Sequence, residues 1–432
     1  MSETRPNVLC ISIDSLRMDF CSVFNSEEAT TPNLESLASS GAVFPFAISP
    51  STWTLQVHAS IFTGLYPPEH QVFDKDRVLG DVPTLPEKMS DTGYDTKSFG
   101  YNGWLEAGDI LRGFDHTSSS PPHRGLENKL RKASFTHTPR DKLTIRNCIN
   151  EIKDSTRPFC HFIHLNNTHY PYIPTNPKHK EFTNIATPRL TYNLLKQRQL
   201  YNNRAKIYTG DFWPDESTVN TAKNLYRGTI KQADEMVNHL LETLSEESLL
   251  KETIIIIFGD HGDSFGEDGI FGHQYSVSDS IIRVPLIIRD PTNVLAQGNH
   301  SDIVQLNDLF PTILDLCGIE PPETNSHSLT NKNSRETAFT YYSVPESFVE
   351  RISSDVDIDE LPPKRQYAAW QSPEKKIIHY PDEDTWSGPA SKNETFRSKL
   401  IKHQSNLNPV DVSNDDELNE NVLQNLKDMG YI

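Results

Sequence analysis

Hydrophobic residues gather in short, almost uninterrupted runs separated by long polar stretches. The three clearest runs are residues 8–13, 158–165 and 253–258, and residues 285–288 form a shorter fourth run. Runs of this kind are typical of strands that are buried on both faces of a sheet. All are far shorter than the roughly 20 apolar residues of a membrane-spanning helix, so we expect no transmembrane segment.

Between these runs, hydrophobic residues recur at helical spacing. The clearest helical segments are residues 31–40, 54–63, 82–92, 222–244 and 306–317. Strands that alternate with helices predict an α/β fold with a mostly parallel central sheet and helices on both faces. Residues 100–150 and 170–220 show no interpretable pattern, and we expect the second stretch to be a long insertion near the site.

The pattern changes after residue 320. A polar stretch leads to shorter strand-like segments at residues 337–342, 366–370 and 375–379, with a turn before the last of them. We therefore expect an α/β domain at residues 1–320 and a small C-terminal α+β subdomain at residues 321–432. The subdomain would contain an antiparallel sheet and would end in an acidic helical tail at residues 415–429.

Composition narrows the class of protein. The net charge of −18 describes an acidic, soluble protein and argues against a nucleic-acid partner. The first residues lack the basic and then apolar pattern of a signal peptide, so we expect a cytoplasmic location. The five cysteines are widely spaced, and we expect free thiols rather than disulfides or a metal cluster. They are Cys10, Cys21, Cys148, Cys160 and Cys317.

Polar residues with metal-binding chemistry follow the hydrophobic runs. Asp14 ends the first run, and Asp260-His261 follow the third. Binding sites form at the carboxyl ends of strands in α/β sheets, so these side chains could converge on one divalent metal. Taken alone, an aspartate at a strand end, such as Asp14, is more often a helix cap. Asp260-His261 is more specific, because a charge beside so apolar a strand is costly without a partner.

A hydroxyl residue, Thr54, opens the predicted helix at residues 54–63. The N-terminus of a helix offers free N–H groups and the positive end of the helix dipole. A hydroxyl group that touches a metal there could lose its proton and act as a nucleophile. The alternative is that Thr54 serves only as the N-cap of the helix.

This segment resembles the signature of the sulfatase family, a branch of the alkaline phosphatase superfamily. In that signature a Cys or Ser that becomes formylglycine is followed by x-Pro-x-Arg and then by a Leu-Thr-Gly helix end. Phe62-Thr63-Gly64 sets the register, which places Thr54 at the nucleophile, Gln56 at the Pro and His58 at the Arg. Further family-like segments occur in family order over most of residues 5–320. They are Pro6-Asn7-Val8, Thr31-Pro32-Asn33-Leu34, Thr168-His169-Tyr170-Pro171, Asp260-His261-Gly262-Asp263, Gly272-His273, Arg283-Val284-Pro285 and Asp308-Leu309-Phe310-Pro311.

The resemblance implies an alkaline phosphatase-like fold and a set of roles for residues in these segments. It implies that one divalent metal is bound by Asp14, Asp260, His261 and the oxygen of Thr54. It also implies that histidines contact the oxygens of the ester or protonate the leaving group. These histidines are His58, His169 and His273.

The chain departs from true sulfatases at several positions. Thr54 cannot become formylglycine, and the usual Asp-Asp and Asp-Asn pairs are Asp14-Ser15 and Asp260-His261. This mixture of carboxylate, hydroxyl and imidazole ligands favours Mn²⁺ or Zn²⁺ over Ca²⁺. The family's Lys-Trp-His stretch aligns with Tyr101-Asn102-Gly103, where Asn102 could donate a hydrogen bond to the substrate.

These departures favour a particular chemistry. A formylglycine hydrate releases sulfate by elimination, whereas an ester of Thr54 must be displaced by a second nucleophile, as in the similar phosphodiesterases and phosphoglycerol transferases. We therefore expect a metal-dependent hydrolase of phosphate or sulfate esters, with phosphate preferred and a covalent Thr54 intermediate. Its substrate would be a small-molecule or a glycan- or lipid-linked anionic ester. The alternatives are an arylsulfatase-type sulfuric ester hydrolase, a transferase of a phosphoalcohol group to a glycan or lipid acceptor, and a non-catalytic relative.

Overall fold

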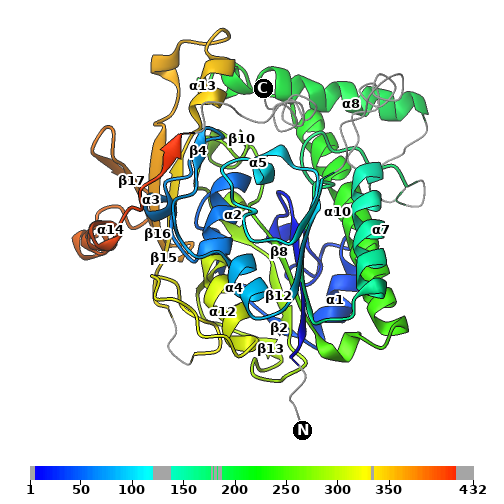
Figure 1. The fold of residues 1–432 in the computed structure, drawn as a ribbon. Helices are drawn as coiled ribbons and strands as arrows, with labels where there is room; N and C mark the ends of the chain where they lie inside the picture. The colour runs from blue at the N-terminus through cyan, green and yellow to red at the C-terminus, as the bar shows by residue number, and fades with distance from the viewer. Residues whose placement is uncertain are drawn as a thin grey trace.

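The centre of the protein is an eight-stranded sheet with the strand order β13-β2-β12-β8-β1-β7-β5-β6. The computed structural model in Figure 1 describes residues 5–119, 138–176, 179, 182, 187–331 and 335–414. The strands of the sheet are β1 (Asn7–Ile13), β2 (Ala42–Val43), β5 (Asp95–Gly100), β6 (His116–Ser119), β7 (Phe159–Leu165), β8 (Thr253–Gly259), β12 (Leu286–Arg289) and β13 (Gly298–Asn299).

The three hydrophobic runs form the three neighbouring central strands β8, β1 and β7, which are parallel to one another. Their carboxyl ends therefore meet at one edge of the sheet, as the sequence predicts. Strand β12 is the fourth run, and it pairs with β8 in the antiparallel direction. The prediction of a mostly parallel central sheet is thus confirmed, with an antiparallel strand beside its centre.

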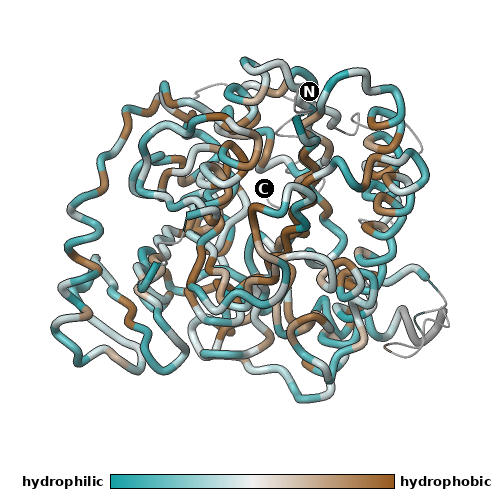
Figure 2. Tube along the Cα trace, turned by 90° about the horizontal axis from the view of Figure 1, so that it is seen from below, coloured by the Kyte–Doolittle hydropathy of each residue, from teal (hydrophilic) through white to brown (hydrophobic). Residues whose placement is uncertain are grey.

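Helices cover both faces of the sheet (Figure 1). Val8, Ile254 and Ile256 belong to a core shared with α2 (Thr54–Thr63), α4 (Leu85–Asp91) and α12 (Leu309–Leu316). Their neighbours Leu9, Ile255 and Ile257 belong to a second core, which is shared with α1 (Pro32–Ala38), α7 (Thr138–Asp154) and α10 (Glu216–Glu246). Figure 2 shows hydrophobic residues along the central strands between the two helical layers. Truncating one of these buried isoleucines to alanine would cost about 2–5 kcal/mol, so the central strands are firmly held.

The expected helices are present with small shifts of their ends. Residues 31–40, 54–63 and 82–92 correspond to α1, α2 and α4, and residues 306–317 correspond to η4 (Leu306–Asp308) followed by α12. Helix α10 begins at its N-cap Asp215, whose side chain accepts a hydrogen bond from the backbone of Thr218. Helix α10 starts earlier than predicted, because its first residues are mostly polar and carry no hydrophobic periodicity.

The stretches without a readable pattern also contain helices. They are α5 (Gly103–Glu106), α7, α8 (Thr187–Asn202) and α9 (Arg204–Tyr208). Exposed apolar side chains such as Leu195 weaken the periodicity of α8, which explains why the sequence did not reveal it.

The C-terminal part contains the antiparallel sheet that the sequence predicts. Its strands are β15 (Ala338–Ser343), β16 (Arg365–Ser372), β17 (Lys375–Tyr380) and β18 (Thr385–Ser387). Helix α13 (Glu346–Ile352) lies between β15 and β16, and α14 (Glu394–Asn406) follows β18. This sheet is bound to the larger part through β15. The Gln305 side chain donates to the carbonyl of Phe339 at 2.8 Å, and the Tyr341 N–H donates to the carbonyl of Pro50 at 2.9 Å. The division at residue 320 stays a prediction, and the acidic helix expected at residues 415–429 lies outside the described residues.

All five cysteines are buried and free, as expected. Among the described residues, no helix combines the length and the apolar character that are needed to cross a membrane.

His70, at the end of α3 (Pro67–His70), provides a test of the fold by pH. Its Nδ1 accepts from the Val72 N–H at 3.1 Å, its Nε2 lies 3.1 Å from the Ser60 hydroxyl, and burial lowers its pKa from 6.5 to about 3. As pH falls through 6.5, His70 of the unfolded chain binds a proton that the folded chain excludes. We expect His70 to remove about 1.4 kcal/mol of stability between about pH 7.5 and about pH 5.5.

This contribution can be isolated with the His70→Gln variant, which has no titrating group at this position. Urea unfolding at both pH values should show a smaller acid-induced loss of free energy in the variant than in the wild-type protein. Equal losses in the two proteins would contradict a neutral, buried His70.

Candidate active site

Two carboxylates and an imidazole meet at the carboxyl ends of β1 and β8. Asp14 directly follows β1, and Asp260 and His261 directly follow β8. Ser15 adopts a left-handed backbone conformation with φ of 57°, which is uncommon outside glycine. This turn points the N–H of Ser15 at Oδ1 of Asp260, at 2.9 Å, and the N–H of His261 donates to the same oxygen at 2.8 Å. The backbone thus fixes the Asp260 carboxylate.

The side chains of Asp14, Asp260 and His261 are fully buried, and one ligand atom of each lies within 4.8 Å of the others. His261 Nδ1–H donates to the carbonyl of Gly262 at 2.9 Å, so the lone pair of Nε2 is available to a metal. That Nε2 lies 3.9 Å from Asp14 Oδ1 and 3.7 Å from Asp260 Oδ2. Asp260 Oδ2 is buried without a hydrogen-bond partner. A buried, unpaired carboxylate oxygen is costly, so these residues fit a divalent cation.

The electrostatics of this group also fit a cation. Burial and the neighbouring Asp14 raise the pKa of Asp260. Burial opposes a charge on His261, yet Asp260 and Asp14 raise the pKa of His261 above its ordinary value. Burial likewise disfavours the charge on Asp14, but His169 and His164 hold the pKa of Asp14 well below its usual range. Two carboxylates are therefore crowded together in a site where only positive charge relieves their repulsion.

Thr54 is the first residue of α2, and its hydroxyl faces the metal-binding group. Thr54 Oγ1 lies 3.4 Å from His261 Nε2. The N-cap of α2 is Trp53, and no side chain caps the helix. Trp53 packs against His273, with ring centroids 5.2 Å apart, and against Trp104 at 5.4 Å. The structure therefore places Thr54 beside the metal-binding group and gives it no capping hydrogen bond.

His273 and His169 lie next to the same group. The His273 ring stacks on that of His261 with centroids 4.3 Å apart, and the rings of His169 and His273 are 6.3 Å apart. His273 Nδ1–H donates to the carbonyl of Thr52 at 2.8 Å, which fixes the ring. Burial and His261 hold the pKa of His273 well below its usual range. His169 is half-buried, so of these histidines it is the more open to solvent.

His58 and Asn102 are placed differently from the expectation that the resemblance implies. His58 lies on α2, and its side chain is fully buried. Its Nδ1 is 2.8 Å from the carbonyl oxygen of Thr54, and its Nε2 is 3.0 Å from the hydroxyl of Ser12. Asn102 Nδ2 donates to Asp14 Oδ2 and to Asn166 Oδ1, both at 3.0 Å. These contacts engage both ring nitrogens of His58 and both amide hydrogens of Asn102. Neither side chain therefore has a hydrogen-bond donor left for a substrate oxygen.

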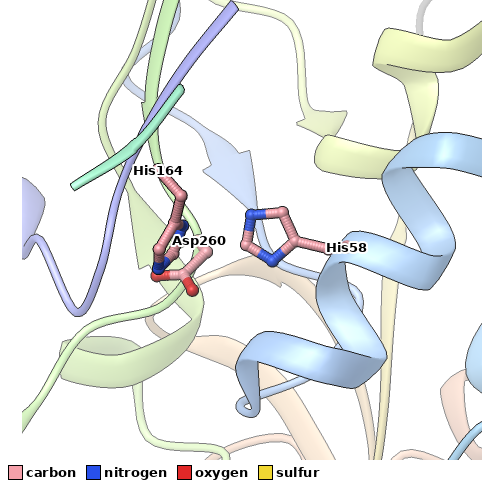
Figure 3. A group of neighbouring side chains, drawn as sticks. All are labelled: His58, His164 and Asp260. Atoms are coloured by element: carbon pink, nitrogen blue, oxygen red, sulfur yellow. The ribbon is translucent and has the colours of Figure 1, made fainter. Parts of the chain in front are cut away.

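Sequence reasoning did not single out His164, which lies inside strand β7. Its Nε2 is 3.2 Å from Asp14 Oδ2, and the side chain is fully buried. His164, His58 and Asp260 also bring ligand atoms within 4.8 Å of one another, and Figure 3 shows His58 of α2 pointing toward the other two. A histidine within a strand buried on both faces was the available signal, because a buried imidazole needs polar partners.

Comparisons with known proteins show which family this chain resembles. A family model described as Sulfatase matches residues 6–319. The choline-sulfatase of Rhizobium meliloti (strain 1021) is 25% identical over 361 residues, covering 75% of this chain and 70% of that protein. The arylsulfatase of Clostridium perfringens (strain 13 / Type A) is 25% identical over 376 residues, covering 74% of this chain and 76% of that protein. Among solved structures, the phosphonate monoester hydrolase of Agrobacterium radiobacter has a similar fold, with a TM-score of 0.71 and 19% identity, covering 93% of this chain and 95% of that one.

Proposed function

This chain belongs to the sulfatase family and has its alkaline phosphatase-like fold, and from that premise we propose that it hydrolyses anionic esters through a covalent intermediate on Thr54. One observation carries the proposal. The Thr54 hydroxyl lies 3.4 Å from His261 Nε2, at the edge of a buried group that includes Asp14 and Asp260. A nucleophile at the N-terminus of a helix, beside ligands for a cation, is the arrangement that attack on an anionic ester requires.

We propose that one divalent metal is bound by Asp14, Asp260, His261 and the Thr54 oxygen. Two carboxylates, one imidazole and one hydroxyl suit Mn²⁺ or Zn²⁺ better than Ca²⁺, which prefers six to eight oxygen ligands. When bound, the cation would lower the pKa of the hydroxyl group and polarise an oxygen of the ester.

In the proposed reaction, the Thr54 hydroxyl gives its proton to water, and the Thr54 oxygen attacks the central atom of the ester in line with the leaving alcohol. The bond to the leaving oxygen breaks, and His169 donates a proton to that oxygen. We assign this proton to His169 because burial keeps His273 neutral, with its pKa well below the usual range. Water then gives a proton to His169 and attacks the threonine ester, which releases the inorganic acid. The released Thr54 oxygen takes up a proton from water, so both residues return to their starting state. His169 and His273 flank the ester during both steps.

We place phosphorus esters first among the substrates. Thr54 has no route to formylglycine, and a phosphothreonine can be displaced by water in a second in-line step. Hydrolysis of sulfate esters is the second candidate, and it is favoured by the similarity to a choline-sulfatase and an arylsulfatase. An acceptor alcohol in place of water would make the protein a transferase.

The proposal is tested by stripping the protein of metal, adding back Mn²⁺, Zn²⁺ or Ca²⁺, and measuring release of para-nitrophenol. The substrates are para-nitrophenyl phosphate, bis-para-nitrophenyl phosphate and para-nitrophenyl sulfate. We expect turnover that depends on Mn²⁺ or Zn²⁺ and is fastest with a phosphorus ester. Turnover of the sulfate alone would overturn the preference for phosphorus. Equal rates with and without metal would contradict the metal-dependent mechanism.

A further inference from the structure

We propose that Ser12, His58 and His164 are positioning residues, which form a buried hydrogen-bonded chain between the Asp14 carboxylate and the backbone of Thr54. The inference rests on the proposed function, since it explains how the metal ligand and the nucleophile are held at a fixed separation. None of these residues is assigned a contact with the substrate.

The chain can be followed atom by atom. His164 Nε2 lies 3.2 Å from Asp14 Oδ2, and His164 Nδ1 lies 3.2 Å from the hydroxyl oxygen of Ser12. The same hydroxyl lies 3.0 Å from His58 Nε2, and His58 Nδ1 lies 2.8 Å from the carbonyl oxygen of Thr54. Each step is within hydrogen-bonding distance, so the chain is continuous from one end to the other.

The directions of these hydrogen bonds follow from the carbonyl end. The carbonyl of Thr54 can only accept, so Nδ1–H of His58 donates to it. Burial disfavours a charged His58 and lowers its pKa well below the usual range, so its Nε2 carries a lone pair and accepts from the Ser12 hydroxyl. Ser12 then has no hydrogen left for His164, and its oxygen accepts from Nδ1–H of His164. The carboxylate of Asp14 can also only accept, so His164 donates from both ring nitrogens, and the hydrogen bonds run outward from His164 to Asp14 and, through Ser12 and His58, to the backbone of Thr54.

The fold dictates this alignment. Ser12 on β1 and His164 on β7 are partners in the parallel register of the sheet, so their side chains leave the same face side by side. That face is the one covered by α2, because Cys10 and Phe162, two residues earlier on each strand, share the hydrophobic core with α2. His58 enters this layer from α2, one helical turn after Thr54 (Figure 3). Ser12, His58 and His164 are all fully buried, so water does not compete for these hydrogen bonds.

The same side chains could instead bind a second cation, since His58, His164 and Asp260 place ligand atoms within 4.8 Å of one another. The Ser12 hydroxyl argues against this arrangement. It already occupies one nitrogen of each ring, and the other nitrogen of each ring faces Thr54 or Asp14. A hydrogen-bonded chain therefore uses every ring nitrogen, whereas a second metal would have to break two of these contacts.

The test compares two serine-to-alanine variants of the full-length protein. Ser12→Ala removes the middle of the chain with the loss of a single oxygen atom. Ser60→Ala is the matched control, since Ser60 lies on α2, is fully buried, and has its hydroxyl 3.1 Å from Nε2 of His70. Ser60→Ala loses one buried contact between a serine and a histidine, and Ser12→Ala loses two. The measurements are the melting temperature, the Mn²⁺ dissociation constant and stoichiometry by calorimetry, and kcat and KM for the best para-nitrophenyl ester.

We expect Ser12→Ala to weaken Mn²⁺ binding and to lower kcat, each by about 10- to 100-fold, as loss of support behind a metal ligand typically does. KM should change by less than about two-fold, because the chain does not touch the substrate. Ser60→Ala should lower the melting temperature by a similar amount and leave Mn²⁺ affinity and kcat within about two-fold of wild type.

Two results would overturn the positioning role. One is a Ser12→Ala variant with the Mn²⁺ affinity and kcat of Ser60→Ala. The other is wild-type protein that binds two Mn²⁺ ions per chain, which would make His58 and His164 metal ligands. If wild-type protein binds Mn²⁺ but hydrolyses none of the esters, the proposed function fails, and the Mn²⁺ affinities of the variants still decide on the chain. Wild-type protein without Mn²⁺ affinity would overturn both.

Discussion

Replacing Thr54 by alanine is expected to lower kcat by roughly four to six orders of magnitude, because loss of a covalent nucleophile removes the reaction path itself. The free energy of unfolding should change by less than about 1 kcal/mol. The hydroxyl caps no helix, and its nearest polar contact is His261 Nε2 at 3.4 Å, so little folding energy depends on it. Steady-state kinetics on the best para-nitrophenyl ester, together with urea unfolding, measure both effects.

Two further variants separate the chemistry of Thr54 from its place on the helix. Thr63→Ala removes a buried hydroxyl from the last residue of α2 and should retain kcat. Thr54→Ser restores a hydroxyl group at the nucleophile position and should retain a measurable part of kcat. A Thr54→Ala variant with wild-type kcat would remove Thr54 from the mechanism.

Asp260→Asn is expected to weaken Mn²⁺ binding by more than about 100-fold and to abolish turnover at micromolar metal concentrations. The substitution replaces a carboxylate oxygen with an amide group that carries no charge, at the position where Asp260 Oδ2 is buried and unpaired. Without metal, the variant should be at least as stable as the wild type. Burial and Asp14 already disfavour the charge on Asp260, so neutralising it relieves repulsion.

Asp234→Asn provides the matched control for this variant. Asp234 is also a buried aspartate, and it accepts hydrogen bonds from the backbone of Asn33 and Leu34. Its substitution should lower the melting temperature in a chelating buffer and leave Mn²⁺ affinity unchanged. The assignment of Asp260 would be wrong if Asp260→Asn bound Mn²⁺ as tightly as wild type, or if both variants lost affinity equally.

The convergence of the proposed metal ligands could largely be predicted, because it depends on strand ends. Asp14 and the pair Asp260-His261 each follow a hydrophobic run, and parallel neighbouring strands bring their carboxyl ends together. Thr54 is a candidate because it opens a helix, and the resemblance to a family places it at the nucleophile. His273 lies in a loop without periodicity and could be added only through that resemblance. The structure brings both beside His261.

The residues that support this group could not be predicted in the same way. His164 sits inside a hydrophobic run, and its role depends on the register that sets it beside Ser12. The family signature places His58 at its arginine position, but it does not predict which atoms His58 contacts. Those contacts depend on how closely α2 packs against β1. Strand β5 was missed because most of its residues are polar, including the buried Thr96 and Ser98, and it ends in a glycine, so no hydrophobic run marks it. Such features arise from tertiary packing, which a single sequence does not reveal.

The alternation of side chains along β1 has a consequence for how this gene can evolve. Val8 and Cys10 belong to the core beside α2, and Leu9, Ile11 and Ile13 belong to the opposite core. Inserting or deleting one codon near the start of β1 would move each later residue of the strand to the opposite face. Ser12 and Asp14 would then point toward the wrong helical layer. Homologues are therefore expected to keep the length of this strand unchanged. Insertions and deletions should accumulate instead in residues 170–220, where added length leaves the register of the central strands intact.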